Sequence, residues 1–416
     1  MADCRVVITG LGTVNPLGHN VAETWDALLE GKSGIARIAR FDPSQFTSQI
    51  GGEVKNWDTV RSELVDPREA KRMDRFSQFA VQSAIEAVED AGLDFSQENV
   101  DRCGVVIGTG IGGLEELETQ HEKMMEKGPK RVSPFTVPKL MGNAAAGNVS
   151  LVGGLRGPNH SVATACASAS TAIGETLRIL QRGEVDVMIT GGSEAALTRI
   201  GLASFCALKG LSTRNDDPEH ASRPFDKGRD GFLLSEGAGV IVLETLEHAQ
   251  ARGAKIYAEL IGYGASADGY HITAPDPEGK GAALAMRKAL ADAGLDTTDV
   301  GYINMHGTST ELGDIAETIA IKKVYGDYAT NGLICSSTKS MTGHLLGASG
   351  GVELIACLKA MENNIIPATQ NIDDPDPQCD LDYVPNTPRE AKVDTMMSNS
   401  FGFGGHNACL VVRRMA

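Results

Sequence analysis

Cys166 is the residue best suited to covalent chemistry, because of the local structure that the sequence predicts around it. Residues 161–166 are predicted to form a strand, and apolar or small residues recur at helical spacing from Ala169 to Leu180. Cys166 then lies at a sharp strand-to-helix turn, where unpaired N–H groups and the positive end of the helix dipole favour a thiolate. Its small neighbours leave room for a bulky thioester, as in a nucleophile elbow. A buried structural cysteine is the alternative interpretation.

Two histidines, His306 and His344, each follow an apolar run and lie in a segment rich in Gly, Ser and Thr. A neutral imidazole can donate a hydrogen bond to a developing enolate oxygen or act as a base. Two imidazoles beside a thiol suit a reaction that generates a carbanion equivalent. A single histidine of this kind is more often a hydrogen-bonded structural residue, so the hypothesis requires the two to lie together near Cys166.

A glycine-rich segment near the C-terminus, residues 399–407, is the third feature with chemical potential. Gly402 and Gly404 flank Phe403, and glycines let the backbone approach a ligand closely. They also leave main-chain N–H groups free to bind an oxyanion. A simple turn with a packed aromatic ring is the alternative.

The elements that must position these residues alternate between short apolar strands and amphipathic helices, which predicts an α/β fold. A helix from about Phe76 ends in Asp-Ala-Gly-Leu-Asp at residues 90–94, and a strand follows at 104–109. The same five residues end another helix at 292–296, before a strand at 301–308. This repeat predicts two similar halves, residues 1–253 with the thiol and residues 254–416 with the two histidines. Chance recurrence of a common glycine helix end is the alternative.

Composition narrows the class of protein. The chain has 416 residues, of which 42% are hydrophobic, enough for one large domain or two fused ones. Its formal net charge of −16 disfavours binding to nucleic acid or to an anionic membrane. We find neither a signal-peptide pattern nor an apolar run long enough for a membrane span, so we expect a cytoplasmic protein. The 8 cysteines are scattered without zinc spacing.

Taken together, these features make the chain resemble the β-ketoacyl-[acyl carrier protein] synthases, most closely the elongating condensing enzymes of the thiolase superfamily. The resemblance covers essentially the whole chain. Six motifs in order carry it: TACASA around Cys166, RPFDKGRDGF at 223–232, DGYHITAPDP at 268–277, HGTST at 306–310, STKSMTGHLLGASG at 337–350 and NSFGFGG at 399–405.

The resemblance implies a duplicated thiolase-like α/β fold with five layers, αβαβα, and two mixed sheets, usually in a homodimer. It also implies a catalytic triad of Cys166, His306 and His344. Cys166 would take an acyl chain from the phosphopantetheine of acyl carrier protein. The two histidines would promote decarboxylation of malonyl-[acyl carrier protein], and the enolate would attack the Cys166 thioester. The products would be CO2 and a β-ketoacyl chain two carbons longer, without a redox cofactor or a catalytic metal.

Further roles follow from the same resemblance. Lys339 would support the site, paired with Glu317, and Asp314 would lie nearby. The main-chain N–H groups of Cys166 and Phe403 would hold the oxyanion, and Phe403 would act as a gate between the two substrate states. The implied substrate-binding residues are Thr308, Thr310 and Thr273 for the pantetheine arm, Ile111 for the acyl pocket, and Gly402 and Gly404 beside the oxyanion. Some members hold a structural Na+ or K+ with residues that match Asn304, Met305, Glu353, Ser398 and Asn399.

Three positions depart from the family pattern. His406 replaces the threonine usual after FGFGG, Glu311 replaces the proline or alanine usual after HGTST, and Ser235 replaces the glycine usual before EGAG. None of these changes removes a catalytic group. His406 lies near the oxyanion loop, so this change bears on the pH profile and the acyl preference.

Acyl carrier proteins are acidic, so the resemblance implies a basic docking face. Asp66 and Pro67 are typical of a helix start, and basic residues at helical spacing follow: Arg68, Lys71, Arg72 and Arg75. Lys130, Arg131 and Lys209 are the other residues of the expected docking site. Taken alone, a basic helix face is usually solvated surface.

Three other functions are alternatives. A polyketide-type ketosynthase would run the same chemistry with another primer and carrier, and the sequence separates the two poorly. A non-catalytic chain-length partner typically lacks the nucleophilic cysteine, so Cys166 and both histidines argue against it. A thioesterase would need water admitted to the acyl-enzyme and a further general base, for which we find no candidate.

Overall fold

The main sheet has ten strands, and its two halves have the same order of antiparallel and parallel strand pairings. The computed structural model describes residues 4–60 and 63–415. The strands are β1 (Val6–Val14), β4 (Cys103–Gly108), β5 (Asn159–Val162), β6 (Val187–Glu194), β7 (Gly237–Thr245), β8 (Ala258–Ala267), β9 (Tyr302–Asn304), β10 (Ile334–Ser336), β13 (Thr395–Gly402) and β14 (His406–Arg413). They lie in the order β10-β9-β13-β14-β8-β1-β7-β6-β4-β5. From β8 and from β1 outward, each half has two antiparallel pairings and then two parallel ones.

The two expected mixed sheets are joined at one edge. β1 and β8 pair antiparallel through Val7↔Glu259 and Ile8↔Ala258. This short ladder makes the two five-stranded halves one continuous sheet that passes around the central helices. Two small sheets lie outside it: β2 (Ala36–Arg37) with β3 (Ile50–Gly51), and β11 (Ile365–Ile366) with β12 (Arg389–Glu390).

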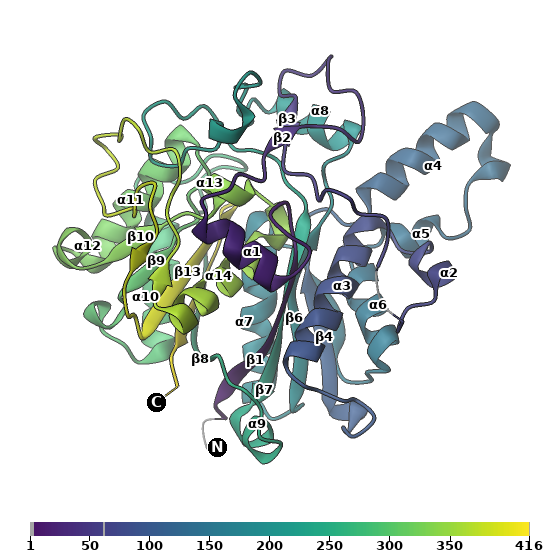
Figure 1. The fold of residues 1–416 in the computed structure, drawn as a ribbon, viewed down its shortest axis with the longest axis horizontal. Helices are drawn as coiled ribbons and strands as arrows, with labels where there is room; N and C mark the ends of the chain where they lie inside the picture. Colours follow the sequence, from purple (N-terminus) through teal and green to yellow (C-terminus); the bar gives the residue numbers. More distant parts are fainter. Residues whose placement is uncertain (1–3, 61–62, 416) are drawn as a thin grey trace.

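Helices cover the sheet in the layers expected for a thiolase-like fold (Figure 1). The layer helices are α3 (Arg75–Asp90), α6 (Ala144–Gly153), α7 (Ser168–Gln181), α10 (Lys280–Ala293), α11 (Glu311–Tyr325) and α14 (Ser349–Asn363). The first two pack outside β1, β6 and β4, whereas α7 and α14 lie between the two halves, and α10 and α11 lie outside the second half. One apolar cluster lies at each of these three helix layers. The αβαβα arrangement is therefore confirmed.

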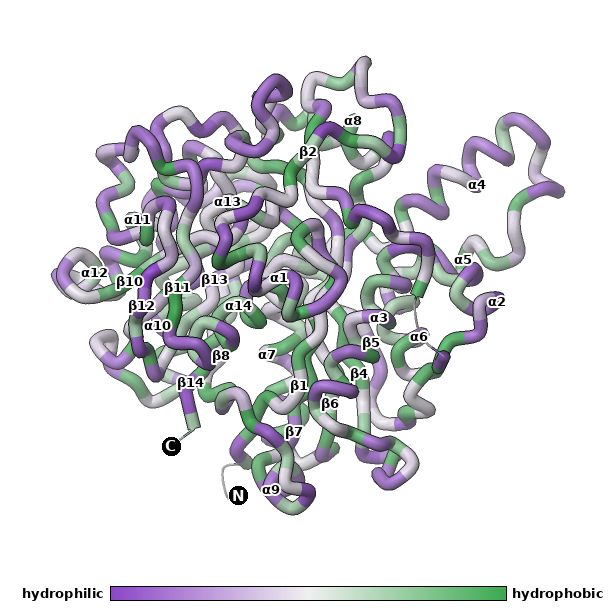
Figure 2. The backbone as a smooth tube through the Cα atoms, viewed as in Figure 1, coloured by the Kyte–Doolittle hydropathy of each residue, from purple (hydrophilic) through white to green (hydrophobic). Residues whose placement is uncertain are grey.

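The other helices surround this frame or project from it. They are α1 (Val21–Leu29), α2 (Pro67–Ala70), α4 (Leu114–Lys127), α5 (Thr136–Leu140), α8 (Arg199–Ala207), α9 (Leu246–Ala251), α12 (Tyr328–Asn331) and α13 (Lys339–Thr342). Figure 2 shows that the central strands are mainly hydrophobic, whereas the projecting α4 is mainly hydrophilic. None of the helices within the described ranges is long and apolar enough to cross a bilayer.

Glycines let one helix approach each half of the sheet closely. A Cβ on Gly12 of β1 would lie 2.0 Å from the carbonyl oxygen of Ser83 in α3. A Cβ on Gly264 of β8 would lie 2.1 Å from that of Ala285 in α10. Because a side chain does not fit at either position, both strands need glycine where the helix backbone crosses them.

The repeated Asp-Ala-Gly-Leu-Asp sequence makes the same contact in each half. Asp90 accepts a hydrogen bond from the main-chain N–H of Leu11 at 2.9 Å, and Asp292 accepts one from Tyr263 at 2.8 Å. In both cases a helix-end carboxylate satisfies a strand N–H group that the ladder leaves unpaired. The two halves therefore share this contact, and the division into residues 1–253 and 254–416 stays a prediction.

Candidate active site

Cys166 lies in a tight turn between β5 and α7. The strand ends at Val162, earlier than the sequence predicted, and a 3-10 turn at Ala165–Ala167 leads into the helix. Ala165 has a φ of 49°, a left-handed conformation that costs energy for a residue with a side chain. The hydroxyl of Ser168 donates to the carbonyl of Ala165 at 2.7 Å and accepts from the N–H of Thr164 at 2.9 Å, which holds the turn. The predicted strand-to-helix elbow is present.

The three predicted catalytic residues meet at one cavity of about 460 Å³. Cys166 reaches it from the first half of the chain, while His306 follows β9 and His344 follows α13 in the second half. The two imidazole rings lie edge to face, with centroids 5.3 Å apart. The thiol and both imidazoles therefore converge on the same space, as their proposed roles require.

The thiol of Cys166 is less acidic than the sequence suggested. It is only 7% exposed, and burial raises its pKa to about 11. The main-chain N–H groups of Phe403 and Cys166 and the ammonium group of Lys339 act in the opposite direction, but they do not outweigh burial. Burial therefore opposes the thiolate that the helix N-terminus favours, and shifts the resting site toward the thiol.

Both histidines are neutral in this environment. Burial and the positive charge of Lys339 hold the pKa of His306 and of His344 well below the usual value. Nδ1 of His306 lies 3.4 Å from Nζ of Lys339. Because an ammonium group can only donate, Nδ1 accepts and Nε2 carries the proton, ready to donate. Nδ1 of His344 lies 3.0 Å from Oγ of Ser349.

Lys339 has a different partner from the one expected. Its side chain is 1% exposed and forms an ion pair with Glu353 of α14. The expected partner, Glu317, instead accepts hydrogen bonds from the main-chain N–H groups of His306 and Gly307, at 2.9 and 2.8 Å. Burial raises the pKa of Glu317 to about 7. Glu317 therefore holds the backbone of the first histidine, while Glu353 compensates the lysine.

Asp314 lies beneath the segment that follows His306. Its carboxylate accepts from the N–H of Phe225 at 3.0 Å and lies 3.4 Å from Nε of Arg229. Burial raises the pKa of this carboxyl to about 6. The expected supporting position of Asp314 fits this geometry, although Arg229, not Lys339, is the cation beside it.

The threonines expected at the pantetheine arm line the same cavity as the triad. Oγ of Thr308 and Oγ of Thr310 lie 3.0 Å apart, and Thr273 lines the cavity from the segment after β8. Glu311 and Lys209 also line it. Lys209 is thus placed beside the catalytic cavity and not within the basic region near α2.

The glycine-rich loop holds Phe403 against Cys166. A Cβ on Gly402 would lie 2.9 Å from the main-chain nitrogen of Cys166, so a side chain there would press on the nucleophile's own backbone. The N–H of Gly404 donates to the carbonyl of Ile272 at 2.6 Å and is not free for an oxyanion. Of the expected N–H groups, those of Phe403 and Cys166 point toward the sulfur. Gly404 instead ties the loop to the 272 segment.

All three departures from the family pattern touch the site, and Glu311 does so as a lining residue of the cavity. The His406 ring is exposed and lies against Gly404, 3.0 Å from the position of a Cβ there. The N–H of Ser235 donates to the carbonyl of His344 at 3.0 Å. A Cβ on Gly343 would lie 2.1 Å from Oγ of Ser235, so this serine packs directly against the residue before His344.

Ile111 is not among the residues that line the catalytic cavity. It is 41% exposed, and its N–H donates to Glu194 at 3.2 Å. Its expected role in the acyl pocket is therefore not met within a single chain.

Glu194, at the end of β6, is a buried carboxylate that the sequence analysis missed. It accepts from the N–H groups of Gly110 and Gly347, at 2.7 and 3.1 Å, and from the hydroxyl of Thr109 at 3.0 Å. Gly347 follows Leu346, whose φ of 48° repeats the elbow of Ala165 before α14. The carboxylate of Glu194 thus binds a main-chain N–H group of a second strained turn, at Leu346–Ala348, in front of α14. The second turn has the same spacing to its helix as the first: Ala165 precedes the start of α7, and Leu346 the start of α14, by the same number of residues. That repeated spacing could have indicated the second turn, and hence a group bound to it.

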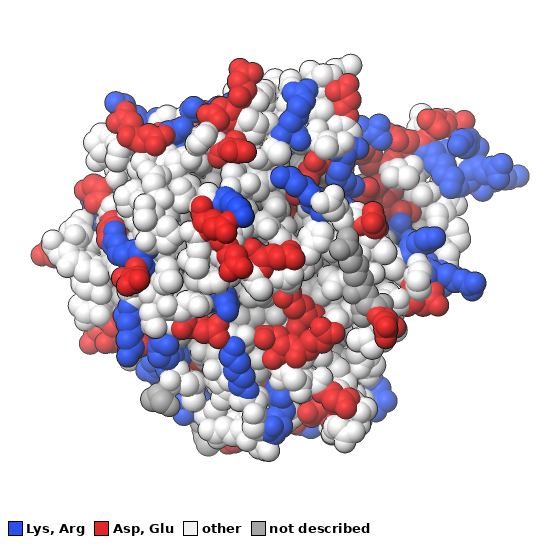
Figure 3. All heavy atoms as spheres, viewed as in Figure 1, with Lys and Arg blue, Asp and Glu red and all other residues white. Residues whose placement is uncertain are grey.

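The predicted basic helix is interrupted. α2 ends at Ala70 and α3 begins at Arg75, whose side chain is 11% exposed and paired with the buried Glu236. Lys71 and Arg72 lie between the two helices, and Arg72 stacks 4.7 Å over the ring of Phe135. Arg68, Lys71 and Arg72 are exposed, as are Lys130 and Arg131 in the turn after α4. Figure 3 shows Lys and Arg gathered at the tip of α4 and near α2.

The fold and the Cys-His-His cavity define a condensing enzyme of the thiolase-like class. Residues 3–249 match the model of the β-ketoacyl synthase N-terminal domain, and residues 257–373 match that of the C-terminal domain. The chain belongs to the β-ketoacyl synthase family.

Its relatives include curated proteins named 3-oxoacyl-[acyl-carrier-protein] synthase 2. The protein from Vibrio harveyi is 49% identical over 416 residues and covers 100% of both chains. That from Synechocystis is 51% identical over 410 residues, which are 99% of this chain and 98% of the relative. Among solved structures, a β-ketoacyl synthase from Burkholderia phymatum is 36% identical with a TM-score of 0.92, covering 99% of this chain and 100% of that one. A type II polyketide ketosynthase in complex with its acyl carrier protein is 35% identical, with a TM-score of 0.92 and full coverage of both chains.

Proposed function

We infer that the protein catalyses a decarboxylative Claisen condensation that extends an acyl chain by two carbons in fatty acid elongation. The convergence of Cys166, His306 and His344 on one cavity carries this conclusion. The relatives near 50% identity are named 3-oxoacyl-[acyl-carrier-protein] synthase 2, which favours fatty acid over polyketide substrates. The polyketide relative at 35% identity keeps a polyketide primer as the second candidate.

The first stage transfers an acyl group to Cys166. Burial raises the pKa of the thiol to about 11, so in this proposal its proton passes to a neutral imidazole as the sulfur attacks the acyl thioester. The N–H groups of Phe403 and Cys166 hold the oxyanion, and each such donor contributes about 3–4 kcal/mol to transition-state stabilisation. The pantetheine thiol then leaves with the proton, and the acyl group remains on Cys166.

The second stage forms the carbon–carbon bond. The bond between the malonyl carbon and its carboxylate breaks, CO2 leaves, and the electron pair forms an enolate. Nε2–H of His306 donates to the enolate oxygen, and His344 lies opposite to complete the pair. The enolate carbon attacks the thioester, the sulfur of Cys166 leaves as a thiolate, and this thiolate takes a proton from solvent to restore the resting thiol. These steps balance without an oxidant or reductant, so we propose no redox cofactor and no catalytic metal.

Three threonines support binding of the phosphopantetheine arm. Thr308, Thr310 and Thr273 line the catalytic cavity and present hydroxyls toward an amide-rich chain. Phe403, whose N–H points at Cys166 from a loop flanked by glycines, is the proposed gate between the acylated and the malonyl-bound states.

A structural Na+ or K+ fits the group of residues proposed to hold it. Four buried side-chain oxygens there have no hydrogen-bond partner within the described ranges: Oδ1 of Asn304, Oε2 of Glu353, Oγ of Ser398 and Oδ1 of Asn399. Unpaired buried oxygens are costly, and a hard cation would satisfy them together with the carbonyl of Met305. We expect a higher midpoint of thermal unfolding in NaCl or KCl than in choline chloride of equal ionic strength. Equal unfolding midpoints in the three salts would contradict the proposed cation site.

We propose that acyl carrier protein docks on the basic surface formed by Arg68, Lys71, Arg72, Lys130 and Arg131. The related ketosynthase solved with its acyl carrier protein supports a carrier as the partner. Arg68→Glu with Arg72→Glu is expected to weaken carrier binding, most strongly at low salt. Arg287→Glu with Lys392→Glu, on the exposed surface of the second half, is the matched control. Equal affinity of the docking variant and the wild type at low salt would contradict the assignment.

We also propose a cytoplasmic homodimer. β5 is the last strand of the sheet, and exposed apolar side chains occur nearby at Ile111, Phe135, Val137 and Met141. A second copy on this face would cover them and bring Ile111 into a closed acyl pocket. Val137→Glu should shift sedimentation toward the monomer, whereas Leu284→Glu on α10 should not. All 8 cysteines are free, which suits a reducing cytoplasm.

Incubation with acyl- and malonyl-[acyl carrier protein], followed by intact mass and CO2 release, tests the function. We expect an acyl adduct on Cys166 when malonyl-[acyl carrier protein] is absent, and loss of that adduct in Cys166→Ala. His306→Ala and His344→Ala should each still acylate to some degree, because one imidazole remains to take the thiol proton, but should not condense. Normal condensation by both histidine variants would refute the assigned roles. A panel of acyl primers then separates fatty acid from polyketide substrates.

A further inference from the structure

The segment that carries Thr308 and Thr310 is strained and must be held from outside. Ser309, between them, has a φ of 68°, in the left-handed region that disfavours residues with a side chain. Two contacts from the 223–232 motif fix it. The N–H of Arg223 donates to Oγ of Ser309 at 3.0 Å, and the N–H of Gly231 donates to its carbonyl at 3.1 Å.

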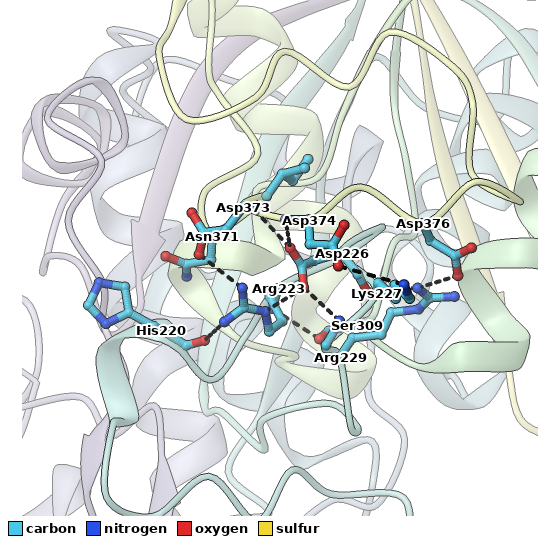
Figure 4. Close-up of polar contacts among 12 residues, drawn as sticks. His220, Arg223, Asp226, Lys227, Arg229, Ser309, Asn371, Asp373, Asp374 and Asp376 are labelled. Atoms are coloured by element: carbon cyan, nitrogen blue, oxygen red, sulfur yellow. Dashed lines mark hydrogen bonds and ion pairs between the residues drawn. The ribbon is translucent and has the colours of Figure 1, made fainter.

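The guanidinium of Arg229 makes further contacts to this segment, in addition to the N–H of Asp314, which donates to the carbonyl of Thr310 at 3.2 Å. Nε donates to the carbonyl of Thr310 at 3.2 Å, and Nη2 donates to that of Glu311 at 3.1 Å. Nη1 donates to the carbonyl of Asp226 and to Oδ2 of Asp376, both at 2.8 Å. The Arg229 side chain therefore bridges the segment that carries the threonines, its own motif and the loop at residue 376; Figure 4 shows the contact between Arg229 and Asp376.

Burial and charge indicate that this bridge is rigid. The Arg229 side chain is 1% exposed, and the carboxylates of Asp314 and Asp376 compensate its charge at 3.4 and 2.8 Å. A planar guanidinium can serve carbonyl groups in several directions at once, whereas an ammonium group is a point donor on a flexible stem. Lysine would keep the charge at this position but would not keep all the contacts.

We propose that Arg229 is a positioning residue, which holds Thr308 and Thr310 in the conformation that receives the pantetheine arm of the substrate. The inference rests on the proposed function, because it assigns these threonines to pantetheine. Arg229 acts through the main chain of Thr310 and Glu311 and has no chemical step of its own.

Arg223 provides a matched control from the same network. Its guanidinium is nearly buried and pairs with Asp226 and Asp373, both at 2.9 Å. It contacts Ser309 through its main chain, and a change of side chain leaves that bond in place. Arg223→Lys therefore disturbs the same charged cluster without releasing the carbonyls of Thr310 and Glu311.

The test measures kcat and KM of Arg229→Lys and Arg223→Lys with malonyl-pantetheine as the extender, together with alkylation of Cys166 by iodoacetamide. For Arg229→Lys we expect KM to rise by about tenfold or more, with alkylation unchanged, because the thiol does not depend on this segment. Arg223→Lys should keep the wild-type KM. An unchanged KM in folded Arg229→Lys, or an equal rise in Arg223→Lys, would overturn the proposal.

Two further variants keep the test decisive if Arg229→Lys folds poorly. Asp376→Asn loosens the guanidinium from outside the cavity and should raise KM in the same direction. Thr308→Val combined with Asp376→Asn should give less than the sum of the two separate effects, since both act on one contact to substrate. Full additivity would contradict the inference. Failure of the wild type to turn over any pantetheine thioester would instead refute the proposed function.

Discussion

Loss of the buried ammonium group of Lys339 should damage both stability and chemistry. Lys339 is 1% exposed, pairs with Glu353 and lies 3.4 Å from Nδ1 of His306. Lys339→Met leaves Glu353 in a buried site without its cation, and Oε2 of this carboxylate already has no hydrogen-bond partner among the described residues. An uncompensated buried charge typically costs about 3–5 kcal/mol.

That cost is a large part of the free energy of unfolding, which for most proteins is about 5–15 kcal/mol. Lys339→Met with Glu353→Gln removes both charges, so the double variant should recover about 2 kcal/mol or more relative to the single one. Lys359→Met is the control on the same helix as Glu353. Its pair with Glu362 is 20% and 32% exposed, so its loss should cost at most about 1 kcal/mol. Urea unfolding followed by circular dichroism measures all three.

The same variant should change the pH dependence of condensation. Burial and the charge of Lys339 both hold the pKa of His306 and of His344 down, so removal of the charge raises both values. The histidines must be neutral to act, and activity is lost when they gain a proton. The acid limb of the pH profile should therefore move to higher pH.

Three results would refute this reasoning. One is a Lys339→Met variant within about 1 kcal/mol of the wild type, less than the cost of an unpaired buried charge. Another is a double variant no more stable than the single one. The third is an acid limb that stays in place in a folded Lys339→Met protein.

Three further predictions concern Gly402 and Glu194 at the candidate site and His248 in α9, away from the site. Gly402→Ala should lower kcat/KM on the order of a hundredfold with an unchanged circular dichroism spectrum, because its Cβ would lie 2.9 Å from the nitrogen of Cys166; wild-type turnover would contradict this. Glu194→Gln removes an anion that raises the pKa of Cys166, so the pH midpoint of alkylation by iodoacetamide should fall, whereas Glu86→Gln, remote from the cavity, should leave it in place. Burial lowers the pKa of His248, but hydrogen bonds to Glu244 and Glu98 outweigh burial and raise it. Its contribution to stability is then present below the unfolded pKa of about 6.5 and lost as pH rises through the folded value. Urea midpoints of His248→Gln should accordingly vary less with pH above about 6.5 than those of the wild type, and parallel curves would exclude this role.

The sequence by itself determined the α/β class, the repeated helix–strand unit and the three candidate catalytic residues, Cys166, His306 and His344. Helical and strand periodicity are local properties, so the helices at 75–90 and 280–293 were predictable from spacing alone. The elbow at Cys166 was readable because small residues and a helix stripe lie next to it in the chain. The histidine motifs indicated chemistry by type and order, but their distance from the thiol was an inference.

Only the tertiary structure decided which carboxylates pair with Lys339 and Arg75 and how burial shifts the pKa of Cys166. Lys339 lies 14 positions from Glu353 and 22 from Glu317, and sequence order does not tell which carboxylate the folded chain brings to it. The turn that separates α2 from α3 directs Arg75 inward to Glu236, so that the spacing of basic residues overstated the exposed face. The pKa of Cys166 depends on burial, which many distant residues produce together, whereas the helix dipole that favoured a thiolate is local. Glu194 and Arg229 gain their roles from contacts to segments far away in the chain, and contacts of that kind leave no periodic signal in the sequence.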